Sequence, residues 1–174
     1  MRVLAIDCST EWLAVAVGDA TGFRERREHA GQAHSERVLP LVDTLLADAG
    51  WRLPDLGGIA FGAGPGSFTG VRIACGVAQG LALGAGLPVA PVPTLLAIAQ
   101  DARRVHGAAR VFACTDARMK EVYVAAYEDV GGTWREVLAP AVVAPADAVL
   151  PGGRWFGAGD GLAAYPDLAR RGAF

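Results

Sequence analysis

Short apolar runs separated by turn residues dominate the first hundred positions of the chain. The runs at 3–6, 13–17, 58–62 and 88–92 predict strands, and a run at 23–29 that alternates with polar residues predicts another. Continuous apolar runs are typical of a sheet that is covered on both faces. Because the connection between the first two runs is short, we expect these two strands to form an antiparallel hairpin.

Three helices are predicted in the same region. Apolar residues three and four apart predict a helix from near Ser35 to Gly50, with Pro40 in its first turn, and Thr94 caps another that runs to about residue 105. Between them, a helix over 70–84 is apolar or small on every side, so it needs cover on two sides. One side can pack on the sheet and leave the other for a partner, whose helix the small residues would let approach closely. A position inside a larger core fits the same pattern.

The second half of the chain repeats this plan. Strands are predicted at 111–115, 121–127, 134–143 and 154–156, with turn residues between them. We therefore expect an α/β fold of two related lobes, each a mixed β-sheet with flanking helices. The N-terminal lobe is assigned to residues 1–100 and the C-terminal lobe to residues 101–174.

Composition and charge narrow the class of protein. Of the 174 residues, 52% are hydrophobic, which is enough for a packed core. With a formal net charge of −2, the chain does not have the strong positive field expected of a protein that binds nucleic acid by itself. Any RNA contact would therefore be shared with a partner. No apolar run is long enough to span a membrane, and no signal peptide precedes the first strand. We expect a cytoplasmic protein without a membrane contact.

The residue types that usually carry catalysis show no recognisable arrangement. Cys8, Cys75 and Cys114 are far apart and lie among apolar neighbours, so we expect buried thiols rather than a disulfide or a zinc site. The three histidines lack the spacing of a helical metal pair, and no G-x-S-x-G elbow is present. The residues alone therefore predict no catalytic residue and no metal ligand.

The most distinctive segment is a glycine-rich loop, GPGSFTGVR at 64–72, that leads into the 70–84 helix. Its glycines permit close backbone approach, and the first amides of the helix suit a phosphate, although the lysine of a P-loop is absent. A capped turn without a ligand fits equally well. Asp7, at the end of the first strand, could hold a magnesium-bound phosphate or accept bonds from its own turn. The candidates for nucleotide binding are Asp7, Ser9, Thr10, Gly64, Gly66 and Ser67.

Three segments together resemble the TsaB family, formerly called YeaZ. They are VLAIDCST at 3–10, GPGSFTGVRI at 64–73 and TDARMKEVY at 115–123. The resemblance implies an actin-like fold with two ribonuclease-H-like lobes and a paralogous relation to the catalytic subunit TsaD. TsaB-like chains usually continue well beyond a segment such as 165–168, whereas this sequence stops at Phe174. We therefore expect the second lobe to be incomplete.

The resemblance implies a subunit of a bacterial tRNA-modifying complex. TsaB-like proteins work with TsaD and the ATPase TsaE to transfer a threonylcarbamoyl group to N6 of the adenosine next to the anticodon, in tRNAs that read codons beginning with A. The chemistry belongs to TsaD. This chain is therefore expected to be no enzyme on its own, to need no intrinsic cofactor and to meet tRNA only through the complex, where ATP or ADP with magnesium could act.

Family members dock through their first two helices, onto TsaD or, when free, onto a second copy. The resemblance assigns partner binding here to Leu41, Leu45, Val71, Ala74, Cys75, Ala78 and Leu81. Ala74→Arg or Ala78→Arg is accordingly expected to abolish docking and leave the lobe folded. Two enzyme classes remain as alternatives: a small-molecule kinase on the same fold, and a glycoprotease-like peptidase, for which the sequence offers neither a metal pair nor a nucleophile with its base.

Overall fold

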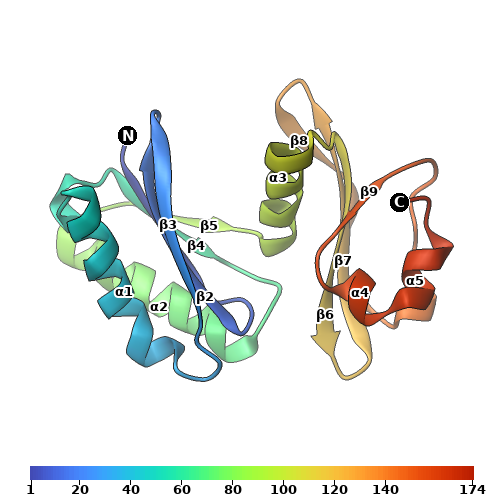
Figure 1. Cartoon of the computed structure of the whole chain (residues 1–174), viewed down its shortest axis with the longest axis horizontal. Coiled ribbons are helices and arrows are strands. Elements are labelled where there is room, and N and C mark those ends of the chain that lie inside the picture. The colour runs from blue at the N-terminus through green and yellow to red at the C-terminus, as the bar shows by residue number, and fades with distance from the viewer. The chain divides into compact units, whose positions relative to one another are not determined.

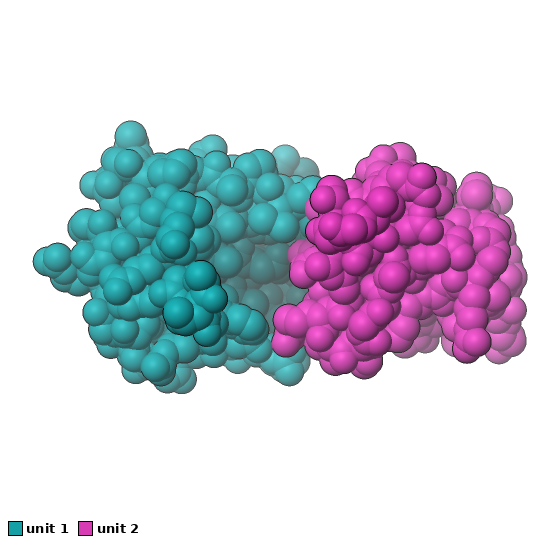
Figure 2. Space-filling view, turned by 90° about the horizontal axis from the view of Figure 1, so that it is seen from above, with its two compact units in different colours: residues 1–94 teal, residues 95–174 magenta.

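The computed structural model describes residues 1–174 and divides into two compact units, Met1–Thr94 and Leu95–Phe174. Figure 1 shows their elements, and Figure 2 shows the two units in separate colours. The division falls before the boundary assigned from the sequence at residue 100. The reason is that helix α3 (Thr94–His106) packs its buried face, including Leu95 and Ala99, on the sheet of the second unit.

Unit 1 is built on a five-stranded mixed sheet with the strand order β3-β2-β1-β4-β5. Strand β1 pairs antiparallel with β2 and parallel with β4, which confirms the predicted hairpin. The other two pairs are antiparallel β2 with β3 and parallel β4 with β5. The strands are β1 (Val3–Asp7), β2 (Trp12–Asp19), β3 (Gly22–His29), β4 (Gly58–Gly62) and β5 (Val89–Val92).

The two helices of unit 1, α1 (His34–Ala49) and α2 (Phe68–Ala85), lie on the same face of this sheet (Figure 1). Every second residue of β1 and β2, such as Leu4, Leu13 and Val15, is buried in the core beneath them. The residues between them face the other side of the sheet, and those at its centre, Ala5, Ala14 and Ala16, are half-buried. Within unit 1, helices therefore cover one face of the sheet, whereas the apolar runs predicted a sheet covered on both faces. Alanine is apolar but small, so it makes these alternating strands look continuously apolar.

Local signals set the ends of both helices. The backbone of Gly50 is left-handed (φ 67°) where α1 ends, and Gly86 (φ 67°) ends α2 in the same way. Helix α2 begins at Phe68, two residues earlier than predicted, because Ser67 is its N-cap and its Oγ accepts a bond from the Gly70 N–H at 3.2 Å. By length and apolar composition α2 could also cross a membrane, a property it shares with core helices of soluble proteins.

Unit 2 repeats the sheet of unit 1 with one strand fewer. Its order is β8-β7-β6-β9, and β6 pairs antiparallel with β7 and parallel with β9, as β1 does with β2 and β4. The strands are β6 (Arg110–Arg118), β7 (Glu121–Val130), β8 (Thr133–Val143) and β9 (Phe156–Ala158). Two mixed sheets of the same topology with flanking helices confirm the predicted fold class.

The sheet of unit 2 is buried on both faces. Val111 and Ala113 of β6 pack with α3, whereas the alternating Phe112 and Cys114 pack in a second cluster with Leu168. Leu168 belongs to α5 (Pro166–Arg171), which follows the short helix α4 (Gly161–Ala164). Here the continuous apolar run does mean a strand covered on both sides, because α3 packs on one face of the sheet and α5 on the other.

Candidate functional site

The turn after β1 is closed by its own hydrogen bonds. The Asp7 carboxylate oxygen Oδ1 accepts from the Ser9 backbone N–H at 2.9 Å and from the Ser9 hydroxyl at 2.6 Å. Thr10 is exposed, and its hydroxyl oxygen accepts from the Trp12 N–H at 3.1 Å. Asp7 therefore accepts hydrogen bonds from its own turn, which is one of the two roles predicted for it. The other role, binding a magnesium-bound phosphate, stays a prediction.

The glycine-rich loop packs directly on this turn. The Ser67 N–H donates to the Ser9 carbonyl at 2.7 Å. A Cβ atom added to Gly66 would stand 2.5 Å from the same carbonyl oxygen, and one added to Gly70 would stand 1.8 Å from the carbonyl oxygen of Cys8. These glycines therefore serve a close contact between two segments of the chain itself.

All six candidates for nucleotide binding come together at the carboxyl ends of the parallel strands β1 and β4. In doubly wound sheets this end is where ligands bind. Asp7, Ser9 and Ser67 already form hydrogen bonds within the turn after β1, within the start of α2 and between these two segments. Nucleotide binding by this group of residues stays a prediction.

The two buried thiols are poor nucleophiles. Burial, with a smaller contribution from the Asp7 charge, raises the pKa of Cys8 to about 12. In unit 2, burial raises the pKa of Cys114 to about 12, and the Asp160 and Asp116 carboxylates act in the same direction. Both side chains therefore carry protons at neutral pH, and Cys75, on α2, is the one thiol that is only partly buried.

These thiols make the folded protein less stable in alkali. The pKa of each thiol is raised on folding, so the folded chain keeps protons that the unfolded chain releases above about pH 9. The stabilisation is complete below that pH and is lost as the pH rises towards 12. We expect the urea midpoint to fall steeply over this range in the wild type and less so in a Cys8→Ala, Cys114→Ala variant. Equal slopes for the two proteins would contradict this prediction.

The histidines do not form a site. The structure brings no three His, Cys, Asp or Glu side chains together in a group that could hold a metal ion. His29 lies 3.3 Å from Glu11, His106 stacks on Phe156, and His34 is buried at the start of α1.

Helix α2 has a buried stripe and an open face. Gly70, Ala74, Ala78 and Ala82 face the core of unit 1 at intervals of four residues. On the opposite side, a Cβ atom added to Gly76, Gly80 or Gly84 would meet nothing within 4 Å. The side chains beside this glycine stripe are strongly exposed: Leu83 by 87% and Phe68 by 75%. We call the surface formed by Phe68, Arg72, Gly76, Gly80, Leu83 and Gly84 the open face of α2.

Three of the residues assigned to partner binding lie in the core of unit 1. Leu45, Ala74 and Ala78 are buried within the chain itself, so they have no surface to offer a partner. Because both alanines are fully buried, we expect arginine at Ala74 or Ala78 to disrupt the core instead of leaving the lobe folded. The remaining residues, Leu41, Val71, Cys75 and Leu81, are half-buried at the margins of the helices.

The glycine spacing could have located the open face from the sequence. Gly76, Gly80 and Gly84 recur every four residues and so share one side of a helix. Alanines recur at the same interval on the opposite side, at 74, 78 and 82. Glycine lowers helix stability relative to alanine, so alanine is the better residue for the side of a helix that packs in the core. The glycine stripe is therefore the better candidate for the open side.

Comparison with known proteins agrees with this fold. The family model for TsaD, tRNA N6-adenosine threonylcarbamoyltransferase, matches residues 27–165. The tRNA threonylcarbamoyladenosine biosynthesis protein TsaB of Escherichia coli K12 is 46% identical over 98% of this chain and 76% of its own length. TsaB of Haemophilus influenzae is 41% identical over 98% of this chain and 77% of its own. The solved structure of YeaZ from Pseudomonas aeruginosa matches 95% of this chain and 78% of its own chain, with a TM-score of 0.89 and 43% identity. The chain therefore belongs to the TsaB (YeaZ) family of tRNA threonylcarbamoyladenosine biosynthesis proteins.

Proposed function

We propose that this chain is the non-catalytic docking subunit of the complex that transfers a threonylcarbamoyl group to N6 of the adenosine next to the anticodon. It binds TsaD directly and TsaE through the complex, acts in the cytoplasm, and meets tRNA only in the assembled complex. Membership of the TsaB family supports the pathway. The observation that supports the docking role is the open face of α2.

The open face suits close packing against another helix. Three glycines in one exposed stripe cost a helix about 1 kcal/mol each relative to alanine, and no contact within the chain offsets this cost. Small residues let two helix axes approach, and the large exposed Leu83 and Phe68 beside them supply apolar area. Leu39 of α1, which is 45% exposed, adds to the apolar surface of the same two helices. In the free protein a second copy would use this surface.

The chemistry of the side chains supports a subunit that relies on TsaD for the reaction. The thiols of Cys8 and Cys114 are held in their protonated form, and the Asp7 carboxylate and the Ser9 hydroxyl bond to each other. No histidine is hydrogen-bonded to a serine or cysteine that it could activate as a general base.

Gly80→Arg tests the docking role. The new side chain meets open space in the isolated chain, and replacing glycine in a helix interior favours the helix by about 0.5–1 kcal/mol. The variant should therefore fold at least as well as the wild type but bind TsaD more than about tenfold more weakly, because the arginine holds the partner helix away. Size-exclusion chromatography with light scattering measures the complex, and threonylcarbamoylation of tRNA by the reconstituted proteins measures its activity.

Ala97→Arg is the matched control, since Ala97 is an exposed small residue of α3 in unit 2. This variant should bind TsaD and support tRNA modification as the wild type does. Undiminished binding and activity of folded Gly80→Arg would overturn the docking role of the open face.

A further inference from the structure

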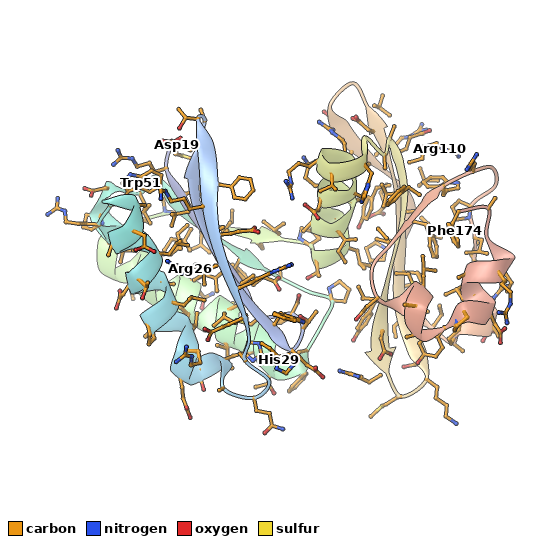
Figure 3. All side chains as sticks on the ribbon, in the orientation of Figure 1. Asp19, Arg26, His29, Trp51, Arg110 and Phe174 are labelled. Atoms are coloured by element: carbon orange, nitrogen blue, oxygen red, sulfur yellow. The ribbon has the colours of Figure 1, made fainter.

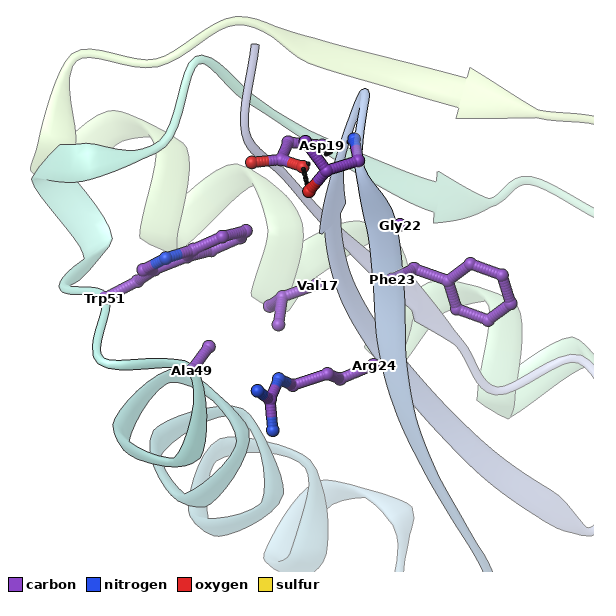
Figure 4. A pocket seen from close by; sticks show the side chains of 8 residues that line it. Val17, Asp19, Gly22, Phe23, Arg24, Ala49 and Trp51 are labelled. Atoms are coloured by element: carbon purple, nitrogen blue, oxygen red, sulfur yellow. Dashed lines mark hydrogen bonds between the residues drawn. The ribbon is translucent and has the colours of Figure 1, made fainter.

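A second feature of unit 1 is a cavity of about 370 Å³ between the β2–β3 turn and the end of α1. Its walls include Val17, Asp19, Arg24, Ala49 and Trp51, and none of them belongs to the open face of α2. Asp19 and Trp51 lie at the end of unit 1 opposite to His29 (Figure 3). Figure 4 shows Arg24 reaching from β3 towards Ala49, with Trp51 above it and Phe23 on the other side of the strand.

Arg24 is the one residue in its row that has no partner in the chain. Arg24, Arg26 and Glu28 alternate along β3 and share the face of the strand that looks towards α1. Arg26 pairs with Asp48 at 2.5 Å, and Glu28 pairs with Arg37 at 2.7 Å, both partners being on α1. No hydrogen bond or ion pair holds Arg24, whose guanidinium instead lines the cavity. Because Arg24 has no acidic partner beside these two ion pairs, its guanidinium is available to bind an anionic ligand.

Trp51 supplies a flat aromatic wall at the same cavity. The guanidinium of Arg2 lies 4.6 Å from the centre of its ring, a cation–π contact that helps to hold the indole in place. Stacking on an aromatic side chain is a general way to bind a heteroaromatic base, since every base has a π-face. Val17 and Ala49 provide the apolar floor between this ring and Arg24.

Asp19 supplies an acceptor at the rim. Its Oδ1 accepts from the Thr21 N–H at 2.9 Å and from the Thr21 hydroxyl at 2.6 Å. These bonds lower the pKa of the carboxyl, so the group is ionised at neutral pH and can only accept. The other oxygen, Oδ2, is free to accept from an amino or ring N–H group of a ligand.

We propose that this cavity binds a nucleotide unit, with the base stacked on Trp51 and donating to Asp19, and the phosphate paired with Arg24. The volume suits a ligand of this size, and each of the three groups matches one part of the nucleotide. The unit can come from two sources, a free nucleoside monophosphate or a nucleotide of single-stranded RNA. Both carry the same base and phosphate chemistry.

Arg24→Gln tests this proposal, with Arg27→Gln as its matched control. Both arginines are exposed on β3 and lose the same charge, but Arg27 lies on the opposite face of the sheet. Calorimetric titrations use AMP, adenosine and a 5′-phosphorylated tetranucleotide of RNA as probes. We expect AMP to bind Arg24→Gln at least about tenfold more weakly than it binds wild type and Arg27→Gln. Adenosine, which lacks the phosphate, should bind all three proteins alike.

The three probes separate the possible outcomes. Arg24-dependent binding of AMP identifies free nucleotide as sufficient, and Arg24-dependent binding of the tetranucleotide alone identifies RNA as the source. AMP binding that is insensitive to Arg24→Gln would place the nucleotide elsewhere on the chain and overturn the proposal. The absence of binding by both phosphorylated probes would overturn it as well. Equal urea midpoints for the two variants confirm that the comparison is between folded proteins.

Discussion

Gly70→Ala should lower the free energy of unfolding of unit 1 by about 3 kcal/mol. Gly70 is buried where α2 meets the turn after β1, and an added Cβ would lie 1.8 Å from the carbonyl oxygen of Cys8. The obstacle is backbone, which cannot rotate away as a flexible side chain would. The turn is also tied to Ser67 and Asp7 by hydrogen bonds, so a shift of Cys8 would strain or break them.

Gly76→Ala, in the same helix, provides the matched control. An added Cβ there meets nothing within 4 Å, so the substitution should raise the free energy of unfolding by about 0.5–1 kcal/mol through helix propensity alone. Urea unfolding followed by far-UV circular dichroism compares the two variants with the wild type. If the two alanine variants unfolded at the same urea concentration, the close contact between Gly70 and Cys8 would not constrain the fold.

Ala78→Arg should unfold unit 1, at a cost of more than about 4 kcal/mol. Ala78 is fully buried in the stripe of α2 that faces the core, among residues that include Val42 and Ile59. The core at this position has no room for an arginine side chain and no acidic partner that would offset the burial of its charge. The variant should therefore have low yield, lose ordered secondary structure and elute with an enlarged radius.

Gly80→Arg differs from Ala78→Arg by only two positions along α2 and is expected to remain folded, because a side chain at Gly80 meets open space. The pair thus distinguishes the buried side of the helix from its open side with one change of residue type. A soluble Ala78→Arg protein with a wild-type circular dichroism spectrum would show that α2 is turned differently about its axis. Docking would then have to be reassigned to the alanine side of the helix.

Much of the fold followed from local patterns. The turn of Gly50 ends α1, Ser67 starts α2, and the short connection at 7–11 produces the antiparallel hairpin, because each of these features depends on neighbouring residues only. The repeated pattern of strands likewise predicted two related lobes, and the four strands of the second sheet have the order of the first four in the first sheet. The sequence predicted less well which faces of the two sheets are covered by helices. Alanines on the second face of β1 and β2 are apolar but too small to show whether a helix packs on them.

The site was predicted only in part. The resemblance to TsaB pointed to α2, but the prediction did not orient this helix, because apolar or small residues occur on every side of it. The glycines at spacing four, opposite the alanines, were the one signal that could have done so. Packing on the sheet decided the matter: the Ala74 side is buried and the Gly80 side is open. The cavity beside Arg24 carried no signal in the sequence, since Arg24 and Trp51 lie on different elements and become neighbours only through folding.

The sequence by itself determined the elements, their grouping into two similar lobes and the family, since these depend on short-range spacing and on recognisable segments. The tertiary structure alone decided which glycines touch the backbone and which face solvent, and which arginine on β3 lacks a partner. Those properties depend on distances between segments that are far apart in the chain. A one-dimensional pattern of apolar and polar residues does not contain such distances.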